Sequence, residues 1–254
     1  MKKLFNIYIS ILVSFMVVSN IAAQDKWYYY TSFQMQINDQ QNDYLLYNGI
    51  RFQTQDLYLS LSIPLIFNHD NTANSNTGNT SNEMMGSNGM SAFNNIDFGD
   101  IYINGSYKLI QESGSFPSFS LEGYVKLPTA PADYYFGSGS ADFQTAVGIR
   151  KIIGSFFLYG QVGYLFLGTQ DENVLNPLTI SSGIGYAFMN GEHSIILGYD
   201  SYSTVVRGSE SPEQIAVGYN YMIKRGLFLN FITSKGLNNS TSDYSFSGGI
   251  NLEL

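Results

Sequence analysis

Few residues of this 254-residue chain could carry out covalent or acid–base catalysis. The sequence contains no cysteine and two histidines, His69 and His193. Ser194 follows His193, but neighbours in an extended strand point to opposite faces, so this histidine is poorly placed to act as a base for that hydroxyl. The sequence also lacks the G-x-S-x-G, H-E-x-x-H, Walker and EF-hand motifs. We therefore expect no catalytic residue, no metal site and no cofactor, and we predict that the chain is not an enzyme.

Three charged residues offer a different chemistry, the selection of ions. Asp100, Lys126 and Asp142 occupy segments whose matched faces would bring the three side chains together near one end of a sheet. A lysine between two carboxylates in a narrow pore biases which ions pass. The same three residues could instead form an ion-pair network that holds the strands together, and both interpretations stay open.

Alternation of apolar and polar residues indicates the elements that carry these side chains. Leu57, Leu59 and Leu61, for example, alternate with Tyr58 and Ser60, and a period of two puts successive side chains on opposite faces of a strand. The pattern predicts twelve strands, at 26–37, 44–54, 57–66, 97–109, 118–127, 142–150, 155–167, 177–188, 193–201, 213–222, 226–235 and 243–254. Most are near the ~9–11 residues that cross a bilayer when tilted. The predicted fold is all-β, a transmembrane antiparallel up-and-down β-barrel.

The connections between the predicted strands support a barrel in the bacterial outer membrane. Joins on one side are short, and those on the other side are mostly longer, as in outer-membrane barrels. The longest, 67–96, is rich in Asn, Ser, Thr and Gly and is predicted to be an extracellular loop. A soluble β-sandwich would also alternate. Only 13% of the residues are charged, however, and uncharged polar faces suit the inside of a barrel better than a solvated sheet.

Residues 1–23 have the features of a secretory signal peptide for Sec-type export. Lys2 and Lys3 precede an apolar run over 4–18, and Ala22-Ala23 forms a cleavage site. A membrane anchor is the alternative, but the run is short and contains Asn6. Removing two lysines from the 12 basic residues would leave 10 against 20 acidic ones, a net charge of −10. That sign excludes binding to nucleic-acid phosphates. The predicted mature barrel is 24–254.

Inward side chains would determine what such a barrel passes. Twelve strands lie between barrels of ~8 strands, which side chains fill, and those of ~16–18, which hold a water channel, so we expect a narrow lumen that tyrosines constrict further. Tyrosines present an apolar face and one hydroxyl, which suits small amphipathic or aromatic solutes, although they could equally fill the interior. Besides the three charged residues above, the predicted lining residues are Tyr28, Tyr30, Arg51, Tyr58, Tyr102, Glu122, Tyr124, Arg150, Tyr159 and Asp200.

Three segments resemble a known family. Asp97-Phe98-Gly99-Asp100-Ile101, Tyr124-Val125-Lys126-Leu127-Pro128-Thr129 and Gly137-Ser138-Gly139-Ser140-Ala141-Asp142 are similar to the signature of the outer-membrane barrels labelled meta-pathway of phenol degradation. The resemblance covers about 95–254. It implies a transport protein in contact with outer-membrane lipid that passes small hydrophobic or aromatic compounds by passive diffusion.

The end of the chain resembles the assembly signal of outer-membrane barrels. Apolar residues alternate up to Leu254, where those barrels usually end in Phe, and this similarity implies the barrel-assembly machinery as a partner. The alternative to a channel is a structural or surface-recognition barrel with a plugged lumen. No oligomeric state follows from the sequence.

Overall fold

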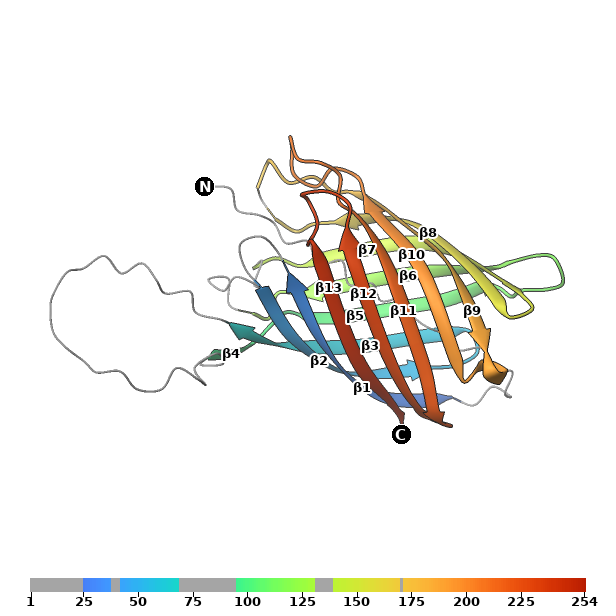
Figure 1. The fold of residues 1–254 in the computed structure, drawn as a ribbon. Coiled ribbons are helices and arrows are strands. Elements are labelled where there is room, and N and C mark those ends of the chain that lie inside the picture. The colour runs from blue at the N-terminus through green and yellow to red at the C-terminus, as the bar shows by residue number, and fades with distance from the viewer. Residues whose placement is uncertain (1–24, 38–41, 69–94, 131–138, 170) are drawn as a thin grey trace, which may run out of the picture.

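The computed structural model describes residues 25–37, 42–68, 95–130, 139–169 and 171–254, and these form one antiparallel sheet rolled into a closed barrel (Figure 1). Its strands are β1 (Lys26–Ile37), β2 (Asn42–Gln53), β3 (Leu57–Asn68), β4 (Asn95–Phe98), β5 (Ile101–Ile110), β6 (Ser118–Leu127), β7 (Asp142–Ile153), β8 (Phe156–Phe166), β9 (Leu178–Phe188), β10 (His193–Tyr202), β11 (Glu213–Lys224), β12 (Leu227–Gly236) and β13 (Tyr244–Glu253). A 3-10 turn, η1 (Met189–Gly191), joins β9 to β10.

Neighbouring strands pair in chain order, and β1 closes the ring by pairing with both β2 and β13. β3 pairs with β4 and then with β5, so these two are successive parts of one barrel strand. The predicted twelve-stranded barrel is therefore confirmed. The predicted signal peptide lies outside the described residues, as does 69–94 of the predicted loop 67–96. That prediction was too long at both ends, because β3 continues to Asn68 and β4 begins at Asn95.

The two faces of the barrel wall differ in chemistry, as the alternation predicted. In β3, Leu59 and Leu61 are 43% and 38% exposed on the outside, whereas Tyr58 and Ser60 are each 4% exposed on the inside. So much outward apolar surface would be unfavourable in water, because each Å² of it costs about 25 cal/mol. It is the surface that a hydrocarbon phase covers without penalty.

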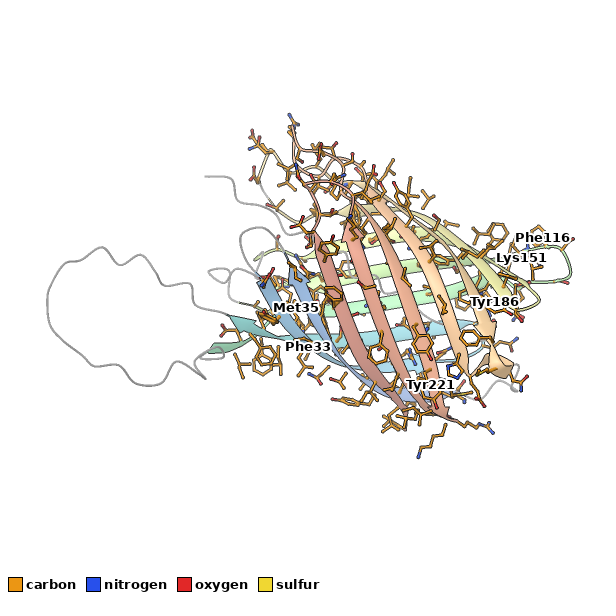
Figure 2. The ribbon with its side chains drawn as sticks, in the orientation of Figure 1. Phe33, Met35, Phe116, Lys151, Tyr186 and Tyr221 are labelled. Atoms are coloured by element: carbon orange, nitrogen blue, oxygen red, sulfur yellow. The ribbon has the colours of Figure 1, made fainter. Side chains whose placement is uncertain are left out.

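Aromatic rings gather on the outer face at both ends of the barrel. Phe33 lies toward one end and Tyr186 and Tyr221 toward the other (Figure 2). The rings of Tyr186 and Phe156 lie 4.8 Å apart between centroids. Two such aromatic girdles flank the apolar band of membrane-spanning barrels. Among the described residues, no helix has the length and apolar character to cross a membrane.

The strand predicted at 97–109 is interrupted, and this part of the prediction was wrong. The break falls at Gly99-Asp100, opposite Pro64 of β3. Gly99 donates its N–H to the Pro64 carbonyl at 2.9 Å, but proline has no N–H to donate in return. The Thr129 hydroxyl replaces that donor and lies 3.2 Å from the Gly99 carbonyl, and it also accepts the Ile101 N–H at 2.9 Å.

The interruption adds one residue to the barrel wall. Ser62 pairs with Tyr102 and Ile66 pairs with Asp97, so four steps along β3 match five steps along β4 and β5. One extra residue on one strand of an antiparallel pair is the definition of a β-bulge, and it shifts the alternation of faces. As a result, Asp97 faces inward in β4, and Tyr102, an even-numbered residue, faces inward in β5. Asp100, at the bulge, is buried.

Candidate functional site

The inner face of the barrel carries all ten lining residues that the sequence singled out. The register pairs inward residues with inward residues, such as Tyr28 with Arg51 and Glu122 with the buried Ala146. The full set comprises Tyr28, Tyr30, Arg51, Tyr58, Tyr102, Glu122, Tyr124, Arg150, Tyr159 and Asp200. They are not gathered at one point but lie along the length of the lumen.

Lys126, Asp142 and Asp100 come together at the end of the lumen opposite the short connections, which we call the outer end. Lys126 and Asp142 are direct cross-strand partners and form an ion pair. Oδ2 of Asp100 lies 3.9 Å from the Lys126 ammonium nitrogen. Main-chain N–H groups fix the carboxylates, since Ala130 donates to Asp100 and Gly168 donates to Asp142, each at 3.0 Å. Asp100 and Asp142 are buried, and 12% of the Lys126 side chain is exposed.

A row of tyrosine rings adjoins this charged cluster, because Tyr102 is the cross-strand partner of Lys126. The Tyr102 ring lies 6.2 Å from that of Tyr47 and 6.0 Å from that of Tyr124, measured between centroids. Sequence reasoning did not select Tyr47. The signal was present, because Tyr47 is four residues before Arg51 on the same strand and therefore on the same inward face. The outer end of the lumen thus combines a cation, two carboxylates and three aromatic rings.

Two of the predicted tyrosines lie along the wall instead of projecting across the lumen. A Cβ on Gly49 would lie 2.5 Å from Cζ of Tyr30, and a Cβ on Gly198 would lie 2.9 Å from the hydroxyl oxygen of Tyr159. The rings occupy space that a side chain on the neighbouring strand would otherwise fill. Glycines in the wall therefore let Tyr30 and Tyr159 lie flat, and the expected constriction by tyrosines does not apply to these two.

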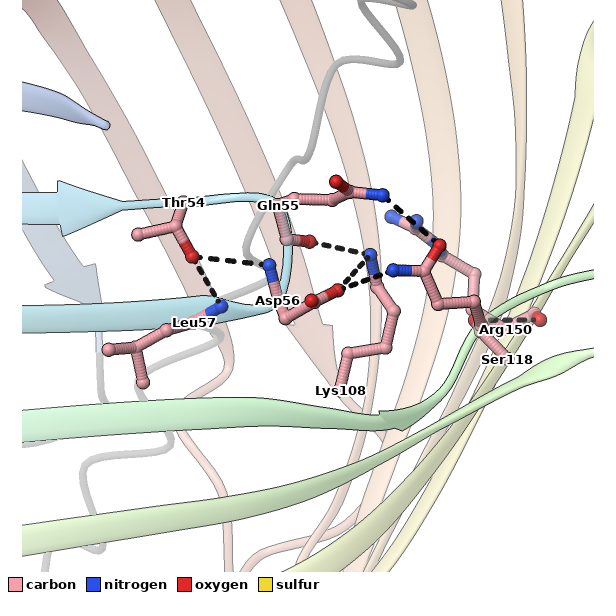
Figure 3. A network of polar contacts seen from close by, with 8 residues as sticks. Thr54, Gln55, Asp56, Leu57, Lys108, Ser118 and Arg150 are labelled. Carbon is pink, nitrogen blue, oxygen red and sulfur yellow. Dashed lines mark hydrogen bonds and ion pairs between the residues drawn. The ribbon is translucent and has the colours of Figure 1, made fainter. Parts of the chain in front are cut away.

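Different charges line the other end of the lumen, toward the short connections. Lys26 contacts Glu253 at 3.0 Å where β1 meets β13. Lys108 donates to the Gln55 carbonyl at 2.7 Å and lies 3.8 Å from Asp56, within a polar network at the β2–β3 turn (Figure 3). Lys108 is not among the predicted lining residues, although its position six residues after Tyr102 places it on the inward face.

In the described part of the chain, no group of three or more His, Asp or Glu residues is arranged to hold a metal ion. The polar groups of the interior can instead bind solutes and water through hydrogen bonds, ion pairs and aromatic contacts. A closed antiparallel barrel with an apolar outer band, two aromatic girdles and a polar interior has the construction of a membrane-spanning β-barrel.

Comparison with known proteins gives the family. The chain belongs to the family described as putative MetA-pathway of phenol degradation, whose model matches residues 30–254. The match confirms the resemblance and extends it to the first three strands. No curated protein matches the chain.

Solved structures share the fold. An outer-membrane channel from Pseudomonas putida F1 is 10% identical with a TM-score of 0.63, and the match covers 91% of this chain and 96% of that one. The KdgM porin is 11% identical with a TM-score of 0.57, and the match covers 89% and 99%.

Proposed function

We propose that this protein is a channel of the outer membrane that lets small amphipathic or aromatic solutes pass by diffusion. The observation that carries the proposal is the polar inner face of a twelve-stranded barrel, on which Arg51, Glu122 and Arg150 remain partly exposed. Charged groups that keep contact with solvent inside a barrel fit a water-filled path better than a packed core. The apolar outer face and the barrel folds of the similar structures support insertion in a membrane.

The proposal needs no cofactor and assigns no catalytic residue. Aromatic faces with single hydroxyl groups would contact the apolar part of a solute, and the ionic groups would contact its polar part. Tyr30 and Tyr159 offer such faces along the wall. Solutes of this kind can exchange one aromatic contact for the next as they move along the lumen.

Conductance of the purified protein in planar bilayers tests the proposal. We expect discrete openings in KCl, together with swelling of liposomes in solutions of small aromatic alcohols. The proposal is contradicted if protein that shows the heat-modifiable gel shift of a folded barrel gives neither openings nor swelling. The alternative of a plugged recognition barrel has one observation in its favour, the burial of Asp100 and Asp142 to 1% and 8% exposed at the outer end, and would be supported by that result.

A further inference from the structure

Lysines neutralise most of the carboxylates at the end of the barrel with the short connections, which is the periplasmic end of the proposed channel. The three ion pairs found there join Lys26 to Glu253 at 3.0 Å, Lys108 to Asp56 at 3.8 Å and Lys151 to Glu112 at 2.8 Å. Each of these carboxylates therefore has a lysine within 4.0 Å. The cations left over at this end of the lumen are arginines.

Arg51 and Arg150 have no such partner. Within the described residues, no carboxylate oxygen lies within 4.0 Å of either guanidinium group. Arg51 stacks on the Tyr28 ring, 4.3 Å from its centroid, and its buried Nε has no hydrogen-bond partner. Arg150 extends beside Lys108, which carries the same charge (Figure 3), and Glu112 attracts it only from beyond 4.0 Å. Both arginines are half-buried, so solvent reaches them.

One inward carboxylate in this region is unpaired and reduces the excess charge. Glu122 accepts a hydrogen bond from the Ser120 hydroxyl at 2.9 Å and forms no ion pair in the described part of the chain. Two arginines against one glutamate leave a net positive charge on this part of the wall. The outer half differs, because Asp43, Asp97, Asp100, Asp142 and Asp200 face inward there, and Lys126 is the one inward lysine of that half among the described residues.

Unpaired arginines next to aromatic rings define a class of ligand. A guanidinium is always charged, and its planar set of N–H donors matches a carboxylate in two parallel hydrogen bonds. The rings of Tyr28 and Tyr30, on the strand next to Arg51, can contact an aromatic ring of the same ligand. We propose that Arg51 and Arg150 form an anion-binding section at the periplasmic end of the lumen, which binds the carboxylate of small aromatic acids. This inference rests on the proposed channel function.

The test of this inference is how strongly benzoate blocks the channel current, with benzyl alcohol as the uncharged comparison. Because the outer half is acidic and the inner half basic, benzoate should block more strongly from the periplasmic side than from the outer side. We expect Arg51→Gln and Arg150→Gln each to weaken the block about tenfold, the effect of losing one charge-assisted hydrogen bond. Lys224→Gln is the matched control, since it removes an exposed cation at the same end of the barrel and should change nothing.

The inference is wrong if benzoate and benzyl alcohol block the current equally. It is also wrong if the Arg51→Gln and Arg150→Gln double variant is blocked by benzoate as strongly as the parent protein. If the glutamine variants lose the heat-modifiable gel shift, Arg51→Lys and Arg150→Lys replace them, because they keep the charge and remove the paired donors. Equilibrium binding of benzoate to the detergent-solubilised protein separates the two proposals. A barrel that does not conduct but binds benzoate only with both arginines present would contradict the channel function and support the anion-binding section.

Discussion

Lys126 is the residue on which the outer end of the lumen depends electrostatically. Its ammonium group neutralises two buried carboxylates, those of Asp100 and Asp142. Replacing Lys126 with Met should destabilise the barrel by about 3–5 kcal/mol, the usual result of leaving a buried charge without its partner. Urea unfolding in detergent micelles measures the change, with Lys224→Met as the exposed control. Equal unfolding midpoints for Lys126→Met and the parent protein would show that the ion pairs contribute nothing net.

The contact between Gly198 and Tyr159 can be tested by a double-mutant cycle. Gly198→Ala should destabilise the protein by about 1–3 kcal/mol because the new methyl group overlaps the tyrosine hydroxyl. Tyr159→Phe removes that hydroxyl, so the double variant should recover most of the loss. The measurement is the coupling free energy from urea unfolding. Additive effects of the two substitutions would mean that the ring does not lie against this glycine.

Among the elements, the bulge between β4 and β5 depends on one hydroxyl group. Thr129→Val leaves the Gly99 carbonyl and the Ile101 N–H without their hydrogen bonds. We expect a loss of about 1–3 kcal/mol in the free energy of unfolding. Thr129→Ser keeps the hydroxyl and should retain most of the stability. If serine and valine are equally destabilising, the methyl group of Thr129 matters and its hydroxyl does not.

The β5–β6 connection, 111–117, extends past the end of the barrel toward Phe116 (Figure 2) and is held by Glu112. Burial acts to raise the pKa of the Glu112 carboxyl group. Hydrogen bonds from Lys151 at 2.8 Å and from the Ile152 N–H at 3.1 Å have the opposite effect and are stronger. The pKa of Glu112 therefore lies below its ordinary value of 4.5. A depressed carboxylate pKa adds stability above the unfolded-state value, and this is lost as pH falls through the folded-state pKa.

Limited proteolysis of this connection should therefore be slow at pH 7 and faster once Glu112 is protonated, below pH 4.5. Glu112→Gln should be cleaved quickly at neutral pH already and should lose most of the pH dependence. The experiment uses an acid-active protease and a control substrate whose own structure does not depend on pH. Cleavage of the control shows how the activity of the protease changes with pH, and any further change reflects opening of the connection. Similar cleavage of the parent and variant at pH 7 would rule out the proposed role of this carboxylate.

The sequence predicted the strands well because alternation is a property of each strand alone. The bulge was missed because it arises from a pairing: Pro64 lacks an N–H, and only the register shows that this gap falls opposite Gly99. The grouping of Asp100, Lys126 and Asp142 followed from matched faces. The flat placement of Tyr30 and Tyr159 could not be predicted, since it depends on which neighbouring strand each side chain leans toward.

At the scale of the whole molecule, the lumen is acidic in its outer half and basic in its inner half. Such an arrangement should make the current through the barrel depend on the sign of the applied voltage. Charges act over about 10 Å in 0.1 M salt and about 3 Å in 1 M salt, so the asymmetry should be strong in 0.1 M KCl and weak in 1 M KCl. Asp200→Asn together with Arg51→Gln should reduce it. A symmetric current–voltage curve at both salt concentrations is the contrary result.

The seam between β1 and β13 sets the order in which the barrel can form. Lys26 and Glu253, which meet there, are 227 positions apart in the chain, whereas every other strand pairs with a near neighbour in sequence. Hairpins can therefore assemble one after another, but β1 keeps an unpaired edge until the last strand arrives. An exposed edge is a template for aggregation. The barrel is consequently most prone to aggregation before β13 pairs with β1, and the residues of β13 protect those of β1.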